Sequence, residues 1–525
     1  MAASVTSLPA ADAPQAVNKW MIAIAVALGA LLEVVDTSIV NVALNEMQNS
    51  LGATLAQVSW VVSSYAVANV IILPLTAWLG DRFGKKRYFI FSLIAFTFAS
   101  VLCGAATSLP VLIVARVLQG LGGGGLMAKA QSILFETFPK KEQPAAQGFF
   151  GAIVIAGPAI GPTLGGYLVS NVNWRWIFFV NVPVGIAAFF MCLVYLPNDP
   201  PQTKVQKPID WLAIALLAVG LGSMQTFLEE GQSEDWFDSP YIVACAVATV
   251  AALVVFVERQ LSSDRPVVDL RVLRHRSLWA GSILSITVGM GLYGALFAIP
   301  IFAQSILRFS SQDTGMLLLP GALASAVAMP IAAKLNTRFD SRALIVAGGV
   351  TIIFALMMLT RLTTQTGTGD LFWPLIIRSF GTVLMFLPLN MATLGPIPKK
   401  DVAAATGFFS LTRQVGGSIA VAVLATLLSR RQTFHHAVLV EKLGSGDPQV
   451  LQRVQMLTAG FVQRGFDPDN AHAKAMALLE QGAQAQAAVL SFGDTFWATA
   501  FLFIATLPLV MVLRKSDNKN VEMGH

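Results

Sequence analysis

Charged side chains are scarce in this sequence of 525 residues. Asp, Glu, Lys and Arg make up 12% of the chain and apolar residues 55%, whereas about a quarter of a soluble domain is charged. The net charge of +6 comes from short basic clusters between long apolar runs, unlike the continuous basic surface of a nucleic-acid-binding protein. The composition therefore excludes a soluble protein and predicts no nucleic-acid partner.

Side chains that hold metals or carry enzyme chemistry are also few. The cysteines Cys103, Cys192 and Cys245 lie inside apolar runs without metal-ligand spacing, which is typical of small packing residues. The five histidines fall in predicted loops or in the tail, and no G-x-x-x-x-G-K-[ST] nucleotide loop is present. We expect no metal site, no cofactor and no enzymatic activity.

Fourteen apolar stretches are long enough to cross a bilayer. A spanning helix needs about 20 apolar residues, because lipid offers no hydrogen-bond partner to an exposed backbone. We therefore expect an all-α membrane protein. The expected spans are 20–44, 57–79, 88–107, 110–135, 146–170, 176–196, 211–228, 241–257, 278–304, 315–333, 343–360, 371–394, 402–429 and 496–513.

The connections between these spans carry unequal charge. Lys and Arg gather on one side, and the short connections of the other side hold only Arg175, Arg308 and Arg361. The positive-inside rule places the basic side and both termini in the cytoplasm. The one long outer connection, 430–495, has Val450 and Val454 among apolar residues at helical spacing, which predicts an amphipathic helix rather than a linker.

Weak internal repeats divide the chain into halves. Pro74 precedes Arg82-Phe83 as Pro330 precedes Arg338-Phe339, which predicts two six-helix bundles around an inserted helix pair. The expected domains are a cytoplasmic tail 1–19, a first bundle 20–197, an inserted pair 198–258, a second bundle 259–513 that includes the periplasmic loop 430–495, and a cytoplasmic tail 514–525.

Two carboxylates lie in the first span, where a charge costs roughly 2.5 to 3.5 kcal/mol. Glu33 and Asp36 share one helical face with Thr37 and Asn41, and Arg116 of the fourth span can reach them. Two close carboxylates should hold one shared proton. The alternative is a structural Asp36–Arg116 ion pair with Glu33 facing water. The proton-site hypothesis predicts that Asp36→Asn abolishes coupled transport and that Glu33→Gln is milder.

The other intramembrane charges are basic. Lys129 lies near the inner end of its span, where it can extend to the interface. Arg378 and Arg413 lie deeper, with no mid-membrane carboxylate in their half. One possibility is that these arginines bind an anionic ligand. The alternative is that they bond to backbone carbonyls or to polar neighbours such as Asn390 and Gln414. The candidate substrate-cavity residues are the polar groups Thr37, Asn41, Gln119, Arg378, Asn390, Arg413 and Gln414.

Four motifs in order resemble those of the major facilitator superfamily, and within it the fourteen-helix drug:proton antiporters of the EmrB/QacA type. The first-span stretch 35–44, the loop 80–87, the stretch 114–120 around Arg116 and the Gly-Pro repeats of 157–166 carry the resemblance. Two positions depart from the family pattern, because Ala77 replaces a glycine and Asn45 a proline. The long outer loop and the stretch 174–183 most resemble the EmrB branch.

The resemblance implies roles for particular residues. The loop 80–87 would latch the cytoplasmic gate, Arg116 would assist proton transfer, and the fifth-span repeats would be the antiporter motif. The repeats also permit close helix approach and kinks. The implied gating residues are Asp81, Arg82, Gly84, Arg87, Gly157, Pro158, Gly161 and Pro162.

The expected function is therefore proton-coupled multidrug efflux across the bacterial inner membrane by alternating access. The expected substrates are amphipathic, hydrophobic weak acids or anions, and the proton gradient is the energy source. EmrB-branch members work with a periplasmic adaptor and an outer-membrane channel. The resemblance therefore implies three partners, namely an EmrA-like adaptor, an outer-membrane channel and membrane lipid. The alternatives are a stand-alone antiporter for one metabolite or fatty acid, an importer, and a non-transporting sensor.

Overall fold

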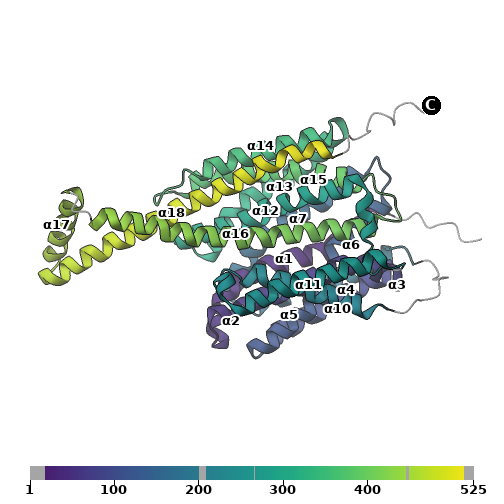
Figure 1. Ribbon diagram of the computed structural model, residues 1–525, viewed down its shortest axis with the longest axis horizontal. Helices are drawn as coiled ribbons and strands as arrows, with labels where there is room; N and C mark the ends of the chain where they lie inside the picture. Colours follow the sequence, from purple (N-terminus) through teal and green to yellow (C-terminus); the bar gives the residue numbers. More distant parts are fainter. Residues whose placement is uncertain (1–17, 200–208, 265, 445–447, 514–525) are drawn as a thin grey trace, which may run out of the picture.

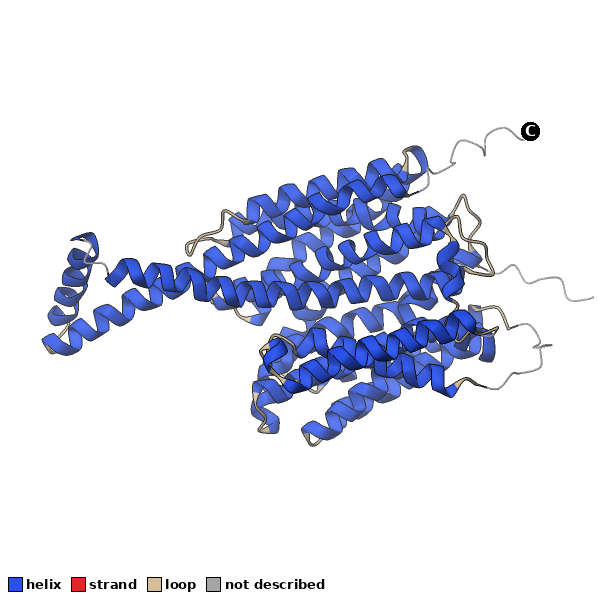
Figure 2. Ribbon diagram, viewed as in Figure 1, coloured by secondary structure: helices blue, strands red, loops and turns tan. Residues whose placement is uncertain are grey.

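A computed structural model describes residues 18–199, 209–264, 266–444 and 448–513, and throughout these ranges the regular elements are helices (Figure 2). Among the described residues, 14 helices are long and apolar enough to cross a membrane, which confirms the expected number of spans. The predicted tails 1–19 and 514–525 lie almost entirely outside the described residues.

The first bundle begins where the Asn18 side chain accepts hydrogen bonds from the amides of Trp20 and Met21. Its first helix ends at Leu51 and is capped by Gly52, which has φ of 62°. Its helices are α1 (Lys19–Leu51), α2 (Leu55–Ile72), the 3-10 helix η1 (Leu73–Leu75), α3 (Thr76–Phe83), α4 (Lys85–Ala105), α5 (Leu109–Gly123), α6 (Leu126–Thr137), α7 (Gln143–Asn171), α8 (Trp176–Phe179) and α9 (Asn181–Tyr195).

The fourth span is broken in its middle. We expected one helix over 110–135, but α5 ends at Gly123 and α6 begins at Leu126. Gly125 adopts φ of 87°, a conformation that suits glycine because it has no Cβ. The break exposes the backbone amides that begin α6, and these amides need partners inside the membrane.

The rest of the chain forms the inserted pair and the second bundle. The inserted pair is α10 (Trp211–Glu230) and α11 (Pro240–Ser262), joined by η2 (Trp236–Asp238). The second bundle contains η3 (Leu270–Arg274), α12 (Arg276–Ser305), α13 (Ser311–Arg338), α14 (Ser341–Leu359), α15 (Thr368–Leu394), α16 (Val402–Gly444), α17 (Pro448–Gln463), α18 (Pro468–Thr506) and η4 (Leu507–Val512).

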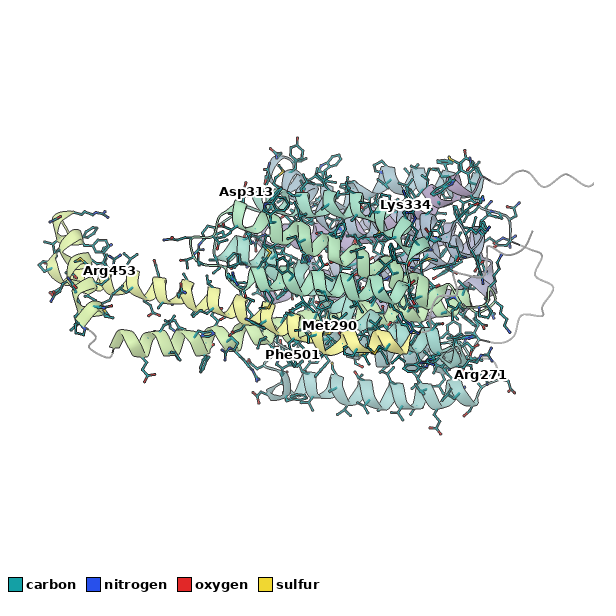
Figure 3. All side chains as sticks on the ribbon, turned by 90° about the horizontal axis from the view of Figure 1, so that it is seen from above. Arg271, Met290, Asp313, Lys334, Arg453 and Phe501 are labelled. Atoms are coloured by element: carbon teal, nitrogen blue, oxygen red, sulfur yellow. The ribbon has the colours of Figure 1, made fainter. Side chains whose placement is uncertain are left out.

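The two bundles meet along long helices (Figure 1). The helix α7 packs on α1 within the first bundle and on α13 of the second. The inserted helix α10 packs on α11, on α2 and on α16, so it touches both bundles. Lys334 and Arg271 lie at one end of the molecule and Asp313 lies toward the other (Figure 3).

A helical stalk projects beyond the bundles (Figure 1). It consists of the far part of α16, the short helix α17 and the first part of α18, so the expected amphipathic helix over 448–461 is confirmed. The spans expected at 402–429 and 496–513 run on into this stalk instead of ending at a loop. Arg431 and His435 of α16 bond to Asp494 of α18 at 2.5 and 2.8 Å, which holds the two long helices together.

Candidate functional site

A buried ion pair joins the first and fourth spans. Arg116 Nη1 lies 2.6 Å from Asp36 Oδ2, and the side chains are 1% and 0% exposed. Asp36 Oδ1 accepts hydrogen bonds from Gln119 Nε2 at 2.9 Å and Asn181 Nδ2 at 3.0 Å. The Arg116 guanidinium also stacks 4.2 Å from the Tyr65 ring centroid. Donors on α5 and α9 therefore satisfy both carboxylate oxygens of Asp36.

Glu33, one turn away on α1, has different partners. Its Oε1 accepts from Asn69 Nδ2 at 2.9 Å, and its Oε2 accepts from the Met127 amide at 2.8 Å. Met127 lies in the first turn of α6, so the carboxylate sits at the positive end of that helix. Glu33 is 6% exposed and forms no ion pair among the described residues.

These contacts change two expectations. Glu33 and Asp36 do not share one site, because each has its own donors and each holds a different half of the broken span. Glu33 does not simply face water, since two donors enclose it. Gln119 was expected in the substrate cavity, but it is 0% exposed and belongs to the Asp36 network. Asn69 and Asn181 were missed because an asparagine in an apolar span gives no charge signal.

The two deep arginines lack hydrogen-bond partners on key atoms. Among the described residues, Nη1 and Nη2 of Arg413 and Nε of Arg378 are buried without a partner. Arg413 instead lies 5.2 Å from the Phe386 ring centroid. The suggested neighbours bond elsewhere: Asn390 accepts from Gln131 Nε2 at 3.0 Å, and Gln414 lies 3.5 Å from the Tyr293 hydroxyl.

Arg378 lines a cavity between the bundles. Residues of α7, α12, α13 and α15 form its walls. Its apolar side includes Pro158 and Leu292, and its polar side combines Arg378 with the hydroxyls of Ser379 and Thr382. An apolar chamber with one cation and nearby hydroxyls suits an amphipathic ligand that ends in an anionic group.

Thr37 and Asn41 lie on the outer side of Asp36 and bond to their own helix. Thr37 Oγ1 donates to the Val34 carbonyl at 2.9 Å, and Asn41 Nδ2 donates to the Thr37 carbonyl at 3.3 Å. Asn41 is exposed. Neither residue lines the cavity that contains Arg378.

The expected gating loop is mostly helical. Asp81 and Arg82 belong to the last turn of α3, Gly84 forms the bend with φ of 93°, and Arg87 is already in α4. Asp199, which the sequence reading missed, accepts from the amides of Lys86 at 2.9 Å and Arg87 at 3.1 Å. A carboxylate from beyond the sixth span thus caps α4 and fixes the bend.

The glycines of α7 allow it to lie directly against α1. A Cβ added to Gly157 would come within 2.6 Å of Val34 Cγ1, and one on Gly161 would overlap the Ser38 hydroxyl. The neighbouring Pro158 and Pro162 lie inside α7, which continues through both. Close approach is therefore the observed role of the glycines.

The inserted helix α10 bonds to both bundles near its outer end. Glu230 Oε1 accepts from Ser63 Oγ of α2 at 2.8 Å, and Gln225 Nε2 donates to Ser418 Oγ of α16 at 2.7 Å. Trp236 Nε1 donates to Thr426 Oγ1 of α16 at 3.0 Å. At the start of α10, a hydrogen bond from Arg259 holds the pKa of Asp210 below its usual range.

Comparison with known proteins agrees with this architecture. Residues 26–421 match the family model of the Major Facilitator Superfamily. The chain is 33% identical to the multidrug export protein EmrB of Escherichia coli K12 over 93% of this chain and 94% of the relative. It is 29% identical to the fatty acid resistance protein FarB of Neisseria gonorrhoeae over 94% of this chain and 96% of the relative.

The fold also matches a crystal structure of the human organic anion transporter MFSD10 (TETRAN), with a TM-score of 0.55, 14% identity, and coverage of 93% of this chain and 99% of that one. The chain is thus a multi-pass inner-membrane transporter and not an enzyme. It belongs to the Major Facilitator Superfamily, and within that superfamily to the EmrB type.

Proposed function

We propose that this transporter is a proton-driven antiporter that exports amphipathic, hydrophobic weak acids and anions. Relatives named for multidrug export and fatty acid resistance support efflux of this kind. The proton gradient is the energy source, with no cofactor, because one proton moving down 100 mV supplies about 2.3 kcal/mol. We retain domain limits of 20–197, 198–258 and 259–513 as part of this proposal.

The observation that carries the proposal is the position of Glu33 at the break in the fourth span. An ionised Glu33 accepts from the Met127 amide and therefore anchors the start of α6. Protonation of Glu33 weakens the hydrogen bond that its carboxylate accepts from the Met127 amide. Proton uptake therefore releases the start of α6 from α1. Asp36 is already paired with the Arg116 guanidinium. Glu33 is therefore the exchanging group, and Asp36 with Arg116 is the fixed pair that positions it.

The substrate would lie in the cavity of Arg378, with its anionic group toward the guanidinium and its apolar part against Pro158 and Leu292. Arg413, whose terminal nitrogens are unpartnered among the described residues, is the second anion-binding candidate. Thr37, Asn41, Asn390 and Gln414 remain proposed cavity residues for other conformations of the cycle, because alternating access changes which polar groups face the interior.

The direct test is efflux in proteoliposomes with an imposed pH gradient and a fluorescent medium-chain fatty acid. We expect gradient-driven movement of the acid that stops when an uncoupler collapses the gradient. A matched neutral amphiphile should move less. Acid flux that does not depend on the pH gradient would contradict proton coupling. Flux of the acid in the import direction would favour an importer.

The stalk supports a periplasmic adaptor and, through it, an outer-membrane channel. The predicted face of α17 packs inward, with Val454 8% exposed, whereas Leu451 and Met456 are 53% and 54% exposed. A projecting helix with exposed apolar side chains suits a helical partner. The stalk also projects away from the bundles (Figure 1), which favours a partner contact over the alternative of a self-packed cap on the transporter mouth.

Adaptor co-purification tests this part of the proposal. The double variant Leu451→Ser and Met456→Ser should lose the adaptor, while Arg453→Ala on the same helix should retain it. Arg453 lies near the far end of the stalk (Figure 3). Equal recovery with all variants would remove α17 from the interface.

A further inference from the structure

A second polar pocket lies away from the proposed substrate cavity. It sits where α3, α4 and α6 of the first bundle meet the start of α16. Thr76, Gly80, Lys85, Lys129, Ser132 and Ala403 are among its lining residues. Because α16 belongs to the second bundle, this pocket spans the boundary between the two halves.

Lys129 is the unusual residue of this pocket. It is 8% exposed, and its Nζ has no hydrogen-bond partner among the described residues. The ammonium does not extend to the interface as the sequence suggested, but lies 2.8 Å from the Tyr88 ring centroid. An ammonium has three hydrogen-bond donors. The face of an aromatic ring attracts the charge but does not replace a hydrogen-bond acceptor for any of these donors. A buried, unpartnered cation is costly unless a counter-charge is bound.

Three carboxylates near the pocket bond to other groups, and Asp81 at the end of α3 acts on Lys129 through space without an ion pair to it among the described residues. Glu136 pairs with Lys85 at 2.6 Å, and Asp199 accepts from two amides of α4. Asp401, just before α16, turns its side chain to His275 at 3.1 Å. No ion pair of Lys129 is present in the described part of the chain.

A second feature also favours an anion. The first turn of α16 borders the pocket at Ala403, and the start of a helix carries partial positive charge and amides without partners inside the helix. Lys129 and the beginning of α16 therefore face one small space from opposite bundles.

We propose that this pocket binds a small oxyanion of the phosphate type, held by Lys129 and the start of α16. The bound anion contacts both bundles at their inner ends, where Gln131 of α6 also bonds to Asn390 of α15. It therefore stabilises the conformation in which these ends are joined. The shared chemistry is a phosphate group, which either a lipid headgroup or free phosphate can supply.

Binding to the full-length purified protein tests the proposal independently of transport. The variants are Lys129→Met, which removes the charge, Lys129→Arg, which keeps it, and Ala403→Leu, which fills the pocket and leaves Lys129 in place. Lys140→Met, at an exposed lysine in the loop before α7, is the matched control. Each variant is compared with its own ligand-free state, because removing a buried charge changes the basal melting temperature.

Two arms distinguish the sources of phosphate. In the first, inorganic phosphate is titrated while the melting temperature is followed. In the second, the protein is placed in phosphatidylethanolamine bilayers with and without phosphatidylglycerol, and the lipids that it retains are counted by native mass spectrometry. We expect at least one arm to show binding for the wild type, Lys129→Arg and Lys140→Met, and loss of that binding for Lys129→Met and Ala403→Leu.

A response in the lipid arm alone identifies a headgroup, and a response in the phosphate arm alone identifies the free ion. The proposal is overturned if neither arm shows binding to the wild type. It is also overturned if Lys129→Met binds as well as Lys140→Met in both arms.

Discussion

The carboxylates of the first bundle and the arginines of the second bundle have opposite surroundings. Asp36 and Glu33 accept hydrogen bonds from four side-chain or backbone groups besides the Arg116 ion pair. Arg378 and Arg413 have buried nitrogens with no partner among the described residues. The first arrangement is satisfied by the protein's own groups, whereas the second leaves buried nitrogens to which the proposed anionic substrate would bond.

In the antiport cycle that we propose, this contrast separates two tasks. The proton acts on a network that already exists and changes one of its acceptors. The substrate supplies the charge that its cavity lacks. Since each task lies mainly in one bundle, relative motion of the bundles can couple them. The predictions below test this division, from the largest expected effect to the smallest.

Loss of the Asp36 charge should have the largest effect on stability. Asp36→Asn leaves Arg116 buried without a counter-charge, which costs about 3–5 kcal/mol of unfolding free energy. We expect a large fall in melting temperature and yield in detergent. The double variant Asp36→Asn and Arg116→Gln should recover part of the loss. Wild-type melting of Asp36→Asn would show that the pair does not stabilise the fold and would favour the shared-proton hypothesis.

Glu33→Gln should instead change coupling more than stability. The amide keeps the shape and loses about one hydrogen bond, worth about 1 kcal/mol, but it cannot release a proton. We expect gradient-driven efflux to fall to background while substrate exchange without a gradient persists. Measuring both fluxes in the same proteoliposomes separates the steps. Normal gradient-driven efflux would return the proton role to Asp36.

Arg378→Gln and Arg413→Gln should weaken anionic substrates selectively. A hydrogen bond to a charged group contributes about 1.5–3 kcal/mol, so we expect affinity for an anionic amphiphile to fall roughly 10-fold to 100-fold. A neutral amphiphile of the same size should bind as before, and the Lys variants should retain part of the preference. Equal losses for anionic and neutral ligands would indicate a packing role instead.

Gln225→Ala should have the smallest effect. It removes the bond from α10 to Ser418 of α16, worth about 1 kcal/mol, or roughly a fivefold change in the ratio of two conformations. Distances between spin labels at the outer ends of α2 and α16 measure that ratio. Ser223→Ala on the same helix is the control, because its hydroxyl bonds within the inserted pair. An unchanged distance distribution with Gln225→Ala would show that α10 does not restrain the bundles.

Much of the fold could be predicted because its causes are local in sequence. Fourteen apolar stretches had to become helices, since lipid leaves the backbone no other partner. The spacing of Gly157 and Gly161 predicted a close helix contact, and α1 lies there. The face of 448–461 predicted a helix, although only the structure shows that the face packs inward and that the neighbouring spans extend into a stalk.

The amino-acid sequence by itself determined the span number and the charges inside the membrane, and it placed Asp36 and Arg116 at similar depths, because composition and depth along a helix suffice for these. Only the tertiary structure decided which donors meet each carboxylate, that a glycine break places the Met127 amide at Glu33, and that Lys129 turns inward. Such contacts join residues as far apart as 145 positions. They depend on how helices rotate and pack against one another, which no local spacing specifies.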